Sequence, residues 1–220
     1  MTALLAALLL SAAPEVTPAA AAGRLADAPT GTLLMSHGAC VYVKAYTGSR
    51  WTHVGVLVRE AGGPVVYDSM KGVGVRSLPL AEYLAAQEGA EVRALRPREP
   101  LGGREAALTS ALRAELGRPY GVSHFLTGRE AEGLHCSEYA SGALSACGLI
   151  EVTKPGDVSP GSLFTGLTRH RIYEAGERFE VAAAEPTPPP GMNACEECWW
   201  ETKQCCKDFG RGVTGWLLCW

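Results

Sequence analysis

The sequence predicts an α+β fold, and three observations point to it. Valines alternate with other residues over His53–Val58, which is the period-two pattern of a β-strand. A second apolar run, Val65–Ser69, follows a turn signal at Gly62–Pro64 and is the expected partner strand. Leucines recur every four residues within Arg104–Leu116, as in a helix. Strands and helices are mixed without the regular alternation of a parallel α/β sheet.

Shorter elements are predicted around this hairpin and helix. Gly117 ends the helix over 104–116, and Gly148 ends a second helix that carries Tyr139 and Leu144 on an apolar stripe. This second helix spans Ser137–Cys147. The remaining predicted elements are strands over Thr32–Met35, Cys40–Val43 and Glu91–Leu95, and a short helix over Leu80–Gln87.

Length and composition limit the organisation and the partners. The chain has 220 residues, which suits one domain with appendages, and its hydrophobic content of 47% is enough for a packed core. The net charge is -3 and no basic block is present, so a nucleic acid partner is not expected. Composition divides the chain into a leader at 1–28, a body at 29–181, a Pro-rich linker at 182–191 and a Cys/Trp-rich tail at 192–220.

The N-terminal segment suggests export. The apolar run Met1–Ala13 is too short to span a bilayer but suits the apolar region of a signal peptide. It lacks the usual Lys or Arg before the run, so an apolar helix of a cytoplasmic protein is the alternative. The Ala/Pro-rich stretch up to Ala28 is not expected in the core. Small residues that suit a cleavage site stand at Ser11, Ala13, Ala20 and Ala22.

The tail concentrates cysteines. Five of the eight cysteines fall within it, together with four tryptophans. In an oxidising compartment these thiols would form disulfides, and in a reducing one four of them could hold zinc. A third interpretation is a Trp-rich segment that contacts a partner or a membrane surface. Because five is odd, one thiol is left over or pairs elsewhere. The five are Cys195, Cys198, Cys205, Cys206 and Cys219.

Four residues of the body form a candidate catalytic set. Cys136 stands at the start of a predicted helix, where the helix dipole and a nearby imidazole favour the thiolate. His53 would act as base and then protonate the leaving group. Asp68 would orient the imidazole, because the hairpin can bring it close to His53. The Cys136 N–H would stabilise the oxyanion, and Tyr120 could add a hydroxyl.

Each of these residues also has a purely structural interpretation. A cysteine in an apolar helix is more often part of the core than a nucleophile, and Cys147 fits that description. A single histidine on a strand is usually structural. Asp68 beside a turn could be a surface carboxylate, and Tyr120 could be a packed loop aromatic.

Seven short motifs follow one another along the body in a fixed order. They are Gly31–Leu34, Thr52–Gly55, Val66–Asp68, Gly72–Leu78, Gly117–Tyr120, Leu134–Tyr139 and Val158–Leu163. This ordered set resembles a known family, the circularly permuted NlpC-type branch of papain-fold cysteine amidases and peptidases (YiiX/YaeF-like). The resemblance covers roughly Thr30–Phe164 and rests on the set rather than on any one motif.

The resemblance implies both a fold and an activity. It implies an antiparallel sheet packed against the helix that bears the nucleophilic Cys136. It also implies amide hydrolysis through an acyl-enzyme, with His53 as base and Asp68 as the third polar residue, a position where the family often has Glu. No cofactor or metal is expected. The implied substrate is a peptide or acyl amide, with peptidoglycan peptides first.

Two other functions stay open. The same fold could carry an acyltransferase or a lipid ester or amide hydrolase. It could also be a catalytically inactive binding module, although the intact pair of Cys136 and His53 argues against that.

Overall fold

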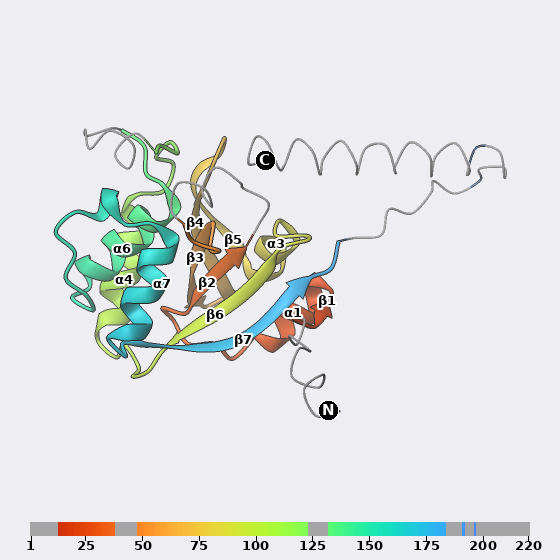
Figure 1. The fold of residues 1–220 in the computed structure, drawn as a ribbon, viewed down its shortest axis with the longest axis horizontal. Coiled ribbons are helices and arrows are strands. Elements are labelled where there is room, and N and C mark those ends of the chain that lie inside the picture. The colour runs from red at the N-terminus through yellow and green to blue at the C-terminus, as the bar shows by residue number, and fades with distance from the viewer. Residues whose placement is uncertain (1–12, 38–47, 123–131, 184–190, 192–195, 197–220) are drawn as a thin grey trace, which may run out of the picture.

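The computed structural model describes residues 13–37, 48–122, 132–183, 191 and 196. Its strands are β1 (Glu15–Val16), β2 (Leu33–His37), β3 (His53–Glu60), β4 (Gly63–Met70), β5 (Gly74–Pro79), β6 (Glu91–Pro97) and β7 (Tyr173–Val181). They form one sheet in the order β1-β7-β6-β2-β3-β4-β5 (Figure 1). Neighbouring strands are antiparallel except β1 and β7, which are parallel. The predicted α+β fold is confirmed.

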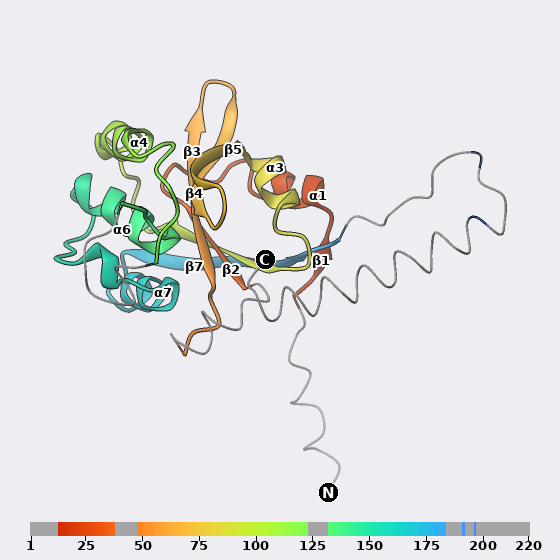
Figure 2. The same cartoon turned by 90° about the horizontal axis from the view of Figure 1, so that it is seen from above.

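Helices cover both faces of this sheet. They are α1 (Pro18–Arg24), α3 (Leu80–Ala85), α4 (Arg104–Ala114), α6 (Cys136–Ala146) and α7 (Pro160–Arg169), with a 3-10 turn η1 at Pro155–Asp157. Helices α4, α6 and α7 lie together on one side, and α1 and α3 lie on the other (Figures 1 and 2). The sheet is therefore the middle layer of three, with a separate apolar core on each side.

The alternation of β3 divides its side chains between the two cores. Val54, Val56 and Val58 are buried against α4, α6 and α7, whereas Leu57 is buried in the core on the side of α1 and α3. Each such side chain contributes about 1.5–3 kcal/mol through burial. This two-sided burial fixes the register of β3, because a shift by one residue would exchange the faces of every side chain.

The segment before Pro29 belongs to the domain, contrary to the expectation from its composition. The Glu180 N–H donates to the carbonyl of Pro14, and β1 adds to the sheet beside β7. Ala21, Leu25 and Ala28 are fully buried in the core shared with α3. Ala21 lies in α1, Leu25 caps its C-terminus and Ala28 follows the helix, so the segment packs as a unit although its composition is Ala/Pro-rich. The prediction that residues 1–28 lie outside the core is therefore wrong for residues 14–28, which pack as part of the domain.

The two long helices lie close to their predicted ranges, and α6 begins at Cys136 itself. The predicted strand at Cys40–Val43 lies outside the described residues, as do most of the linker and nearly all of the tail. Among the described residues, no helix combines the length and the apolar character needed to cross a membrane.

Candidate active site

His53 and Asp68 meet on the hairpin of β3 and β4. The register pairs Gly55 with Asp68, so Asp68 lies diagonally across from His53 on the same face. The Nε2 atom of His53 is 2.9 Å from Oδ2 of Asp68. Burial of Asp68 would raise the pKa of its carboxyl, but the bonds from His53 and Arg76 hold that pKa below its usual value. The carboxylate is therefore ionised although it is fully buried.

An aromatic ring supports the imidazole. Tyr83 of α3 stacks on His53, with ring centroids 6.4 Å apart and planes 26° apart. Gly55 leaves the room that this arrangement needs. A Cβ atom at Gly55 would lie 2.9 Å from the Tyr83 hydroxyl and 2.6 Å from Cγ1 of Val66. The glycine two residues after His53 is thus required for packing around the imidazole.

Cys136 completes the arrangement as the first residue of α6. Its thiol is buried and lies within hydrogen-bonding reach of His53. Because Nε2 of His53 is bonded to Asp68, Nδ1 is the ring nitrogen left for Cys136. Burial would raise the pKa of the thiol, but the charge of His53 and hydrogen bonds from His135 and His53 lower it. Cys136 and Asp68 raise the pKa of His53 against its burial, so the pair favours thiolate and imidazolium.

His135 fixes the start of α6. Its Nδ1 accepts from the Glu138 N–H at 3.2 Å, and its Nε2 donates to the Gly156 carbonyl at 3.0 Å. The Glu138 carboxylate accepts from the His135 N–H in return, which completes a capping box. Burial lowers the pKa of His135, whereas Cys136 and the Gly156 carbonyl raise it, with a net rise.

A second bond ties the same helix end to the segment after η1. The Ser137 hydroxyl donates to the Val158 carbonyl at 2.6 Å. Together with the bond from His135 to Gly156, it anchors the first turn of α6 to residues 156–158. The position of Cys136 therefore depends on a segment more than twenty residues further along the chain.

Tyr120 lies beside the same thiol. It forms a short parallel bridge with Leu134, which directly precedes the cap of α6. Burial and the charge of Cys136 both raise the pKa of Tyr120. The structure thus brings together all four residues that the sequence singled out, His53, Asp68, Cys136 and Tyr120.

Sequence reasoning missed three neighbours of this site. His135 could have been found from the Glu three residues after it, which is the spacing of a capping box. Arg76 could be placed only from the register of β4 and β5, which pairs it with Asp68. Tyr83 had no local signal, because its contact with His53 joins a helix and a strand about thirty residues apart.

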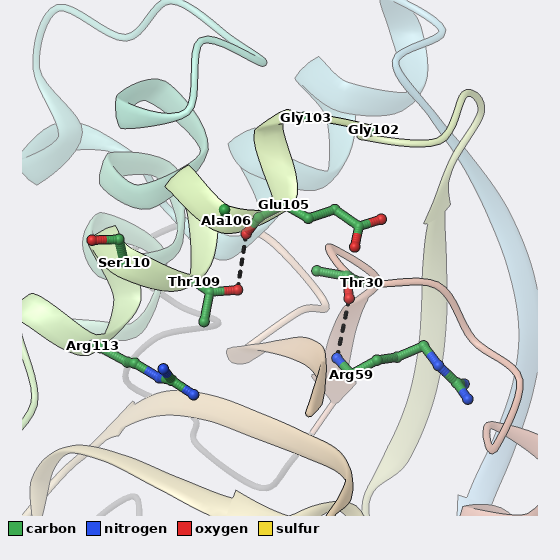
Figure 3. Close-up of a pocket in the computed structure, with 9 residues that line it drawn as sticks. All are labelled: Thr30, Arg59, Gly102, Gly103, Glu105, Ala106, Thr109, Ser110 and Arg113. Carbon is green, nitrogen blue, oxygen red and sulfur yellow. Dashed lines mark hydrogen bonds between the residues drawn. The ribbon is translucent and has the colours of Figure 1, made fainter. Parts of the chain in front are cut away.

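A separate hollow of about 610 Å³ lies at the opposite end of β3 (Figure 3). It is lined by Arg59 at that end and by residues along α4 from Glu105 to Arg113. Arg59 follows His53 by six residues on β3, which is roughly 20 Å at ~3.3 Å per residue. Its two arginines are engaged, since Arg59 donates to the Ala26 carbonyl and Arg113 pairs with Glu60 at 2.9 Å. The hollow is therefore distinct from the site around Cys136.

Comparison with known proteins identifies the family. The permuted papain-like amidase enzymes of the YaeF/YiiX, C92 family match residues 27–155, more than half of the chain. No curated protein matches. The crystal structure of YiiX from Escherichia coli O157:H7, described as a metalloprotein, shares the fold with a TM-score of 0.51 at 20% identity, covering 72% of this chain and 99% of that one.

The described residues offer no metal centre to compare with that description. Across 13–37, 48–122 and 132–183, no three His, Cys, Asp or Glu side chains are grouped as metal ligands. Cys136 and Cys147 are free thiols in this part of the chain. The match over residues 27–155, together with the shared fold, shows that the chain belongs to the permuted papain-like amidases of the YaeF/YiiX family.

Proposed function

We propose that this amidase uses Cys136 as its nucleophile and cleaves an amide bond through an acyl-enzyme. One observation carries the assignment. The thiol at the start of α6 lies close enough to His53 for each group to shift the pKa of the other, and Nε2 of His53 is bonded to the buried, ionised Asp68. Nucleophile, base and orienting group thus stand in the order that thiol hydrolysis requires.

The geometry supports a two-step reaction. The Cys136 thiolate attacks the amide carbonyl carbon, and the oxyanion is stabilised by the Cys136 N–H, which has no partner within the helix at this first position. The Tyr120 hydroxyl is the second proposed donor. His53 protonates the leaving nitrogen as the C–N bond breaks, which leaves a thioester. Water, deprotonated by His53, then attacks the thioester and releases the acid and the thiolate.

The proposed substrate is a peptide of the cell wall. The family supports an amide substrate, and export of the chain would bring the enzyme to that compartment. Acyl transfer and lipid ester or amide hydrolysis are the competing activities. A panel of peptidoglycan peptides, N-acyl amides and lipid esters distinguishes them when released amine, acid and transferred acyl groups are measured by mass spectrometry.

Cys136→Ala provides the direct test in the full-length chain. It should abolish turnover and the mass increase of a trapped acyl-enzyme. Cys147→Ala is the matched control, because Cys147 is a buried free thiol at the other end of the same helix. This control variant should keep both turnover and the mass increase of the acyl-enzyme. Full activity of Cys136→Ala would overturn the mechanism. Acyl transfer or ester cleavage in place of amide cleavage would favour the competing activities, and no turnover together with an unreactive Cys136 would favour a binding module.

We also propose export, with any cleavage before Pro14. Cleavage after Ala20 or Ala22 would remove β1, whose Val16 carbonyl accepts from the Ala182 N–H, and would expose part of the core. Mass spectrometry of the protein from the exported fraction should show a mature start no later than Pro14. A mature, active protein that starts after Ala22, or one retained whole in the cytoplasm, would contradict this proposal.

A further inference from the structure

Arg76 makes a second, unpredicted contact with the buried carboxylate. It lies directly opposite Asp68 in the register of β4 and β5. Its Nε is 2.9 Å from Oδ1 of Asp68, and its Nη2 is 3.4 Å from Oδ2. His53 bonds Oδ2 from the other side at 2.9 Å. Both oxygens are therefore engaged, and the plane of the carboxylate is fixed by groups on two different strands.

This contact determines what Asp68 can do for the imidazole. A fully buried carboxylate beside a neutral histidine tends to take up a proton, because burial disfavours the charged form. A protonated Asp68 would donate to Nε2, and the proton of the neutral imidazole would then stand on Nδ1. An ionised Asp68 accepts from Nε2–H instead and leaves Nδ1 free to take the proton of Cys136.

His53 and Arg76 both favour the ionised form of Asp68, and of the two only Arg76 keeps its charge when the imidazole is neutral. Apart from Arg76, the groups that interact electrostatically with Asp68 are His53 on β3, Tyr83 on α3, Tyr139 on α6 and, through His53, Cys136. Burial, with a smaller contribution from the charge of Asp68, raises the pKa of both tyrosines, so they remain neutral and cannot compensate that charge. A guanidinium remains charged at every working pH.

We propose that Arg76 is a positioning residue of this site, which keeps Asp68 ionised and oriented so that Nδ1 of His53 faces Cys136. The inference rests on the proposed function, because it assigns Arg76 a role in the same reaction. Arg76 acts through Asp68 and His53 rather than by touching the reacting atoms.

The test compares Arg76→Met with Arg76→Lys in the full-length chain. One readout is the pH profile of Cys136 alkylation by iodoacetamide, followed by peptide mass spectrometry, which needs no substrate. The other is the pH profile of kcat/KM on the best amide of the panel. Removing a nearby cation favours the protonated form of its neighbours. In Arg76→Met, the alkylation midpoint and both limbs of the activity profile should therefore move to higher pH, by about one unit.

Arg76→Lys should restore the position of these profiles, because it restores the charge. Its kcat should still be lower than that of the wild type, by about tenfold to hundredfold, because an ammonium cannot hold both carboxylate oxygens in plane. Arg113→Met is the matched control. It removes an arginine that pairs with Glu60 at the far end of the same hairpin, and it should shift neither profile.

Folding and function are separated by two further measurements. If Arg76→Met is too unstable, the double variant Arg76→Met/Asp68→Asn removes both charges and should lose no more kcat than Asp68→Asn alone. A larger loss would overturn the inference, as would an Arg76→Met profile that coincides with that of the wild type. If Cys136 of the wild type alkylates no faster than an ordinary free thiol, the proposed function itself fails.

Discussion

The two ends of the β3–β4 hairpin carry nearly the same groups in different surroundings. At one end, Arg76 bonds Asp68 at 2.9 Å, and their side chains are 22% and 0% exposed. At the other, Arg113 bonds Glu60 at 2.9 Å, with side chains 56% and 26% exposed. Each carboxylate has a further partner, His53 for Asp68 and Tyr67 for Glu60.

Burial is what separates the two pairs. Water screens the exposed pair, so its charges have little effect on neighbouring groups. The buried pair acts through a medium of low dielectric, where the state of one group determines the state of the next. An arginine–carboxylate bond is therefore no sign of a site by itself. We expect such a bond to be functional only where, as at Asp68, the carboxylate is buried and bonded to a histidine near a thiol.

Exchanging each carboxylate for its amide should give the largest contrast. Asp68→Asn should lower kcat on the order of 10²- to 10⁴-fold, because an amide can hold the wrong histidine tautomer. Glu60→Gln should leave kcat/KM unchanged. Steady-state kinetics on both variants provides the check, and equal losses at the two ends would show that burial does not set the difference.

Glycine substitutions probe the packing at the same two ends. Gly55→Ala should destabilise the fold by about 1–3 kcal/mol, because its Cβ would meet the Tyr83 hydroxyl and Val66. The displaced His53 should also cost activity. Gly62→Ala, at the turn, is the control, since nothing lies within 4 Å of a Cβ there. Urea unfolding measures the stabilities. A Gly55→Ala variant as stable as the wild type would contradict the close packing of Gly55 against Tyr83 and Val66.

Substitution of His135, the N-cap residue of α6, should have a smaller effect, which a second substitution should reverse. His135→Ala should cost about 1 kcal/mol and part of the activity, whereas His135→Asn should recover both by supplying a new acceptor for the Glu138 N–H. Ser159→Ala removes the equivalent cap of α7, where the Ser162 N–H donates to Ser159 at 3.0 Å. It should cost stability alone. Failure of Asn to rescue would assign His135 a direct role at the thiolate.

The loss of unfolding free energy at acid pH should give the smallest difference between the two ends. The folded pKa of Asp68 lies below its unfolded value, so its contribution is present above about pH 4 and is lost as pH falls through the folded pKa. Glu60 shifts in the same direction through its bonds to Tyr67 and Arg113, but it is partly exposed. Between pH 7 and pH 3, Asp68→Asn should therefore lose less stability than wild type, and Glu60→Gln should resemble wild type. Identical slopes for all three proteins would contradict this.

Local patterns predicted most of the fold around the site. Alternation and a turn signal predicted β3 and β4, and the apolar stripe after Cys136 predicted α6. The candidate residues His53, Asp68 and Cys136 could therefore be identified from short stretches of chain. Arg76 and Tyr83 could not be predicted in this way, because their contacts depend on the register of β4 and β5 and on where α3 packs against the sheet. Composition misled at the N-terminus, where alanines that suit a signal segment also allow α1 to pack closely. Cys40 and the tail cysteines lie outside the described residues.

The parallel pairing of β1 with β7 makes neighbours of the two ends of the folded body. Pro14 and Val16 bond residues 180 and 182, so the chain enters and leaves at one edge of the sheet. The edge strand β1 lies four strands away from β3, roughly 19 Å at ~4.8 Å per strand. A short peptide joining these ends would close the body into a ring without approaching Cys136. A domain fused at either end would likewise attach at that edge and leave β3 and β4 uncovered.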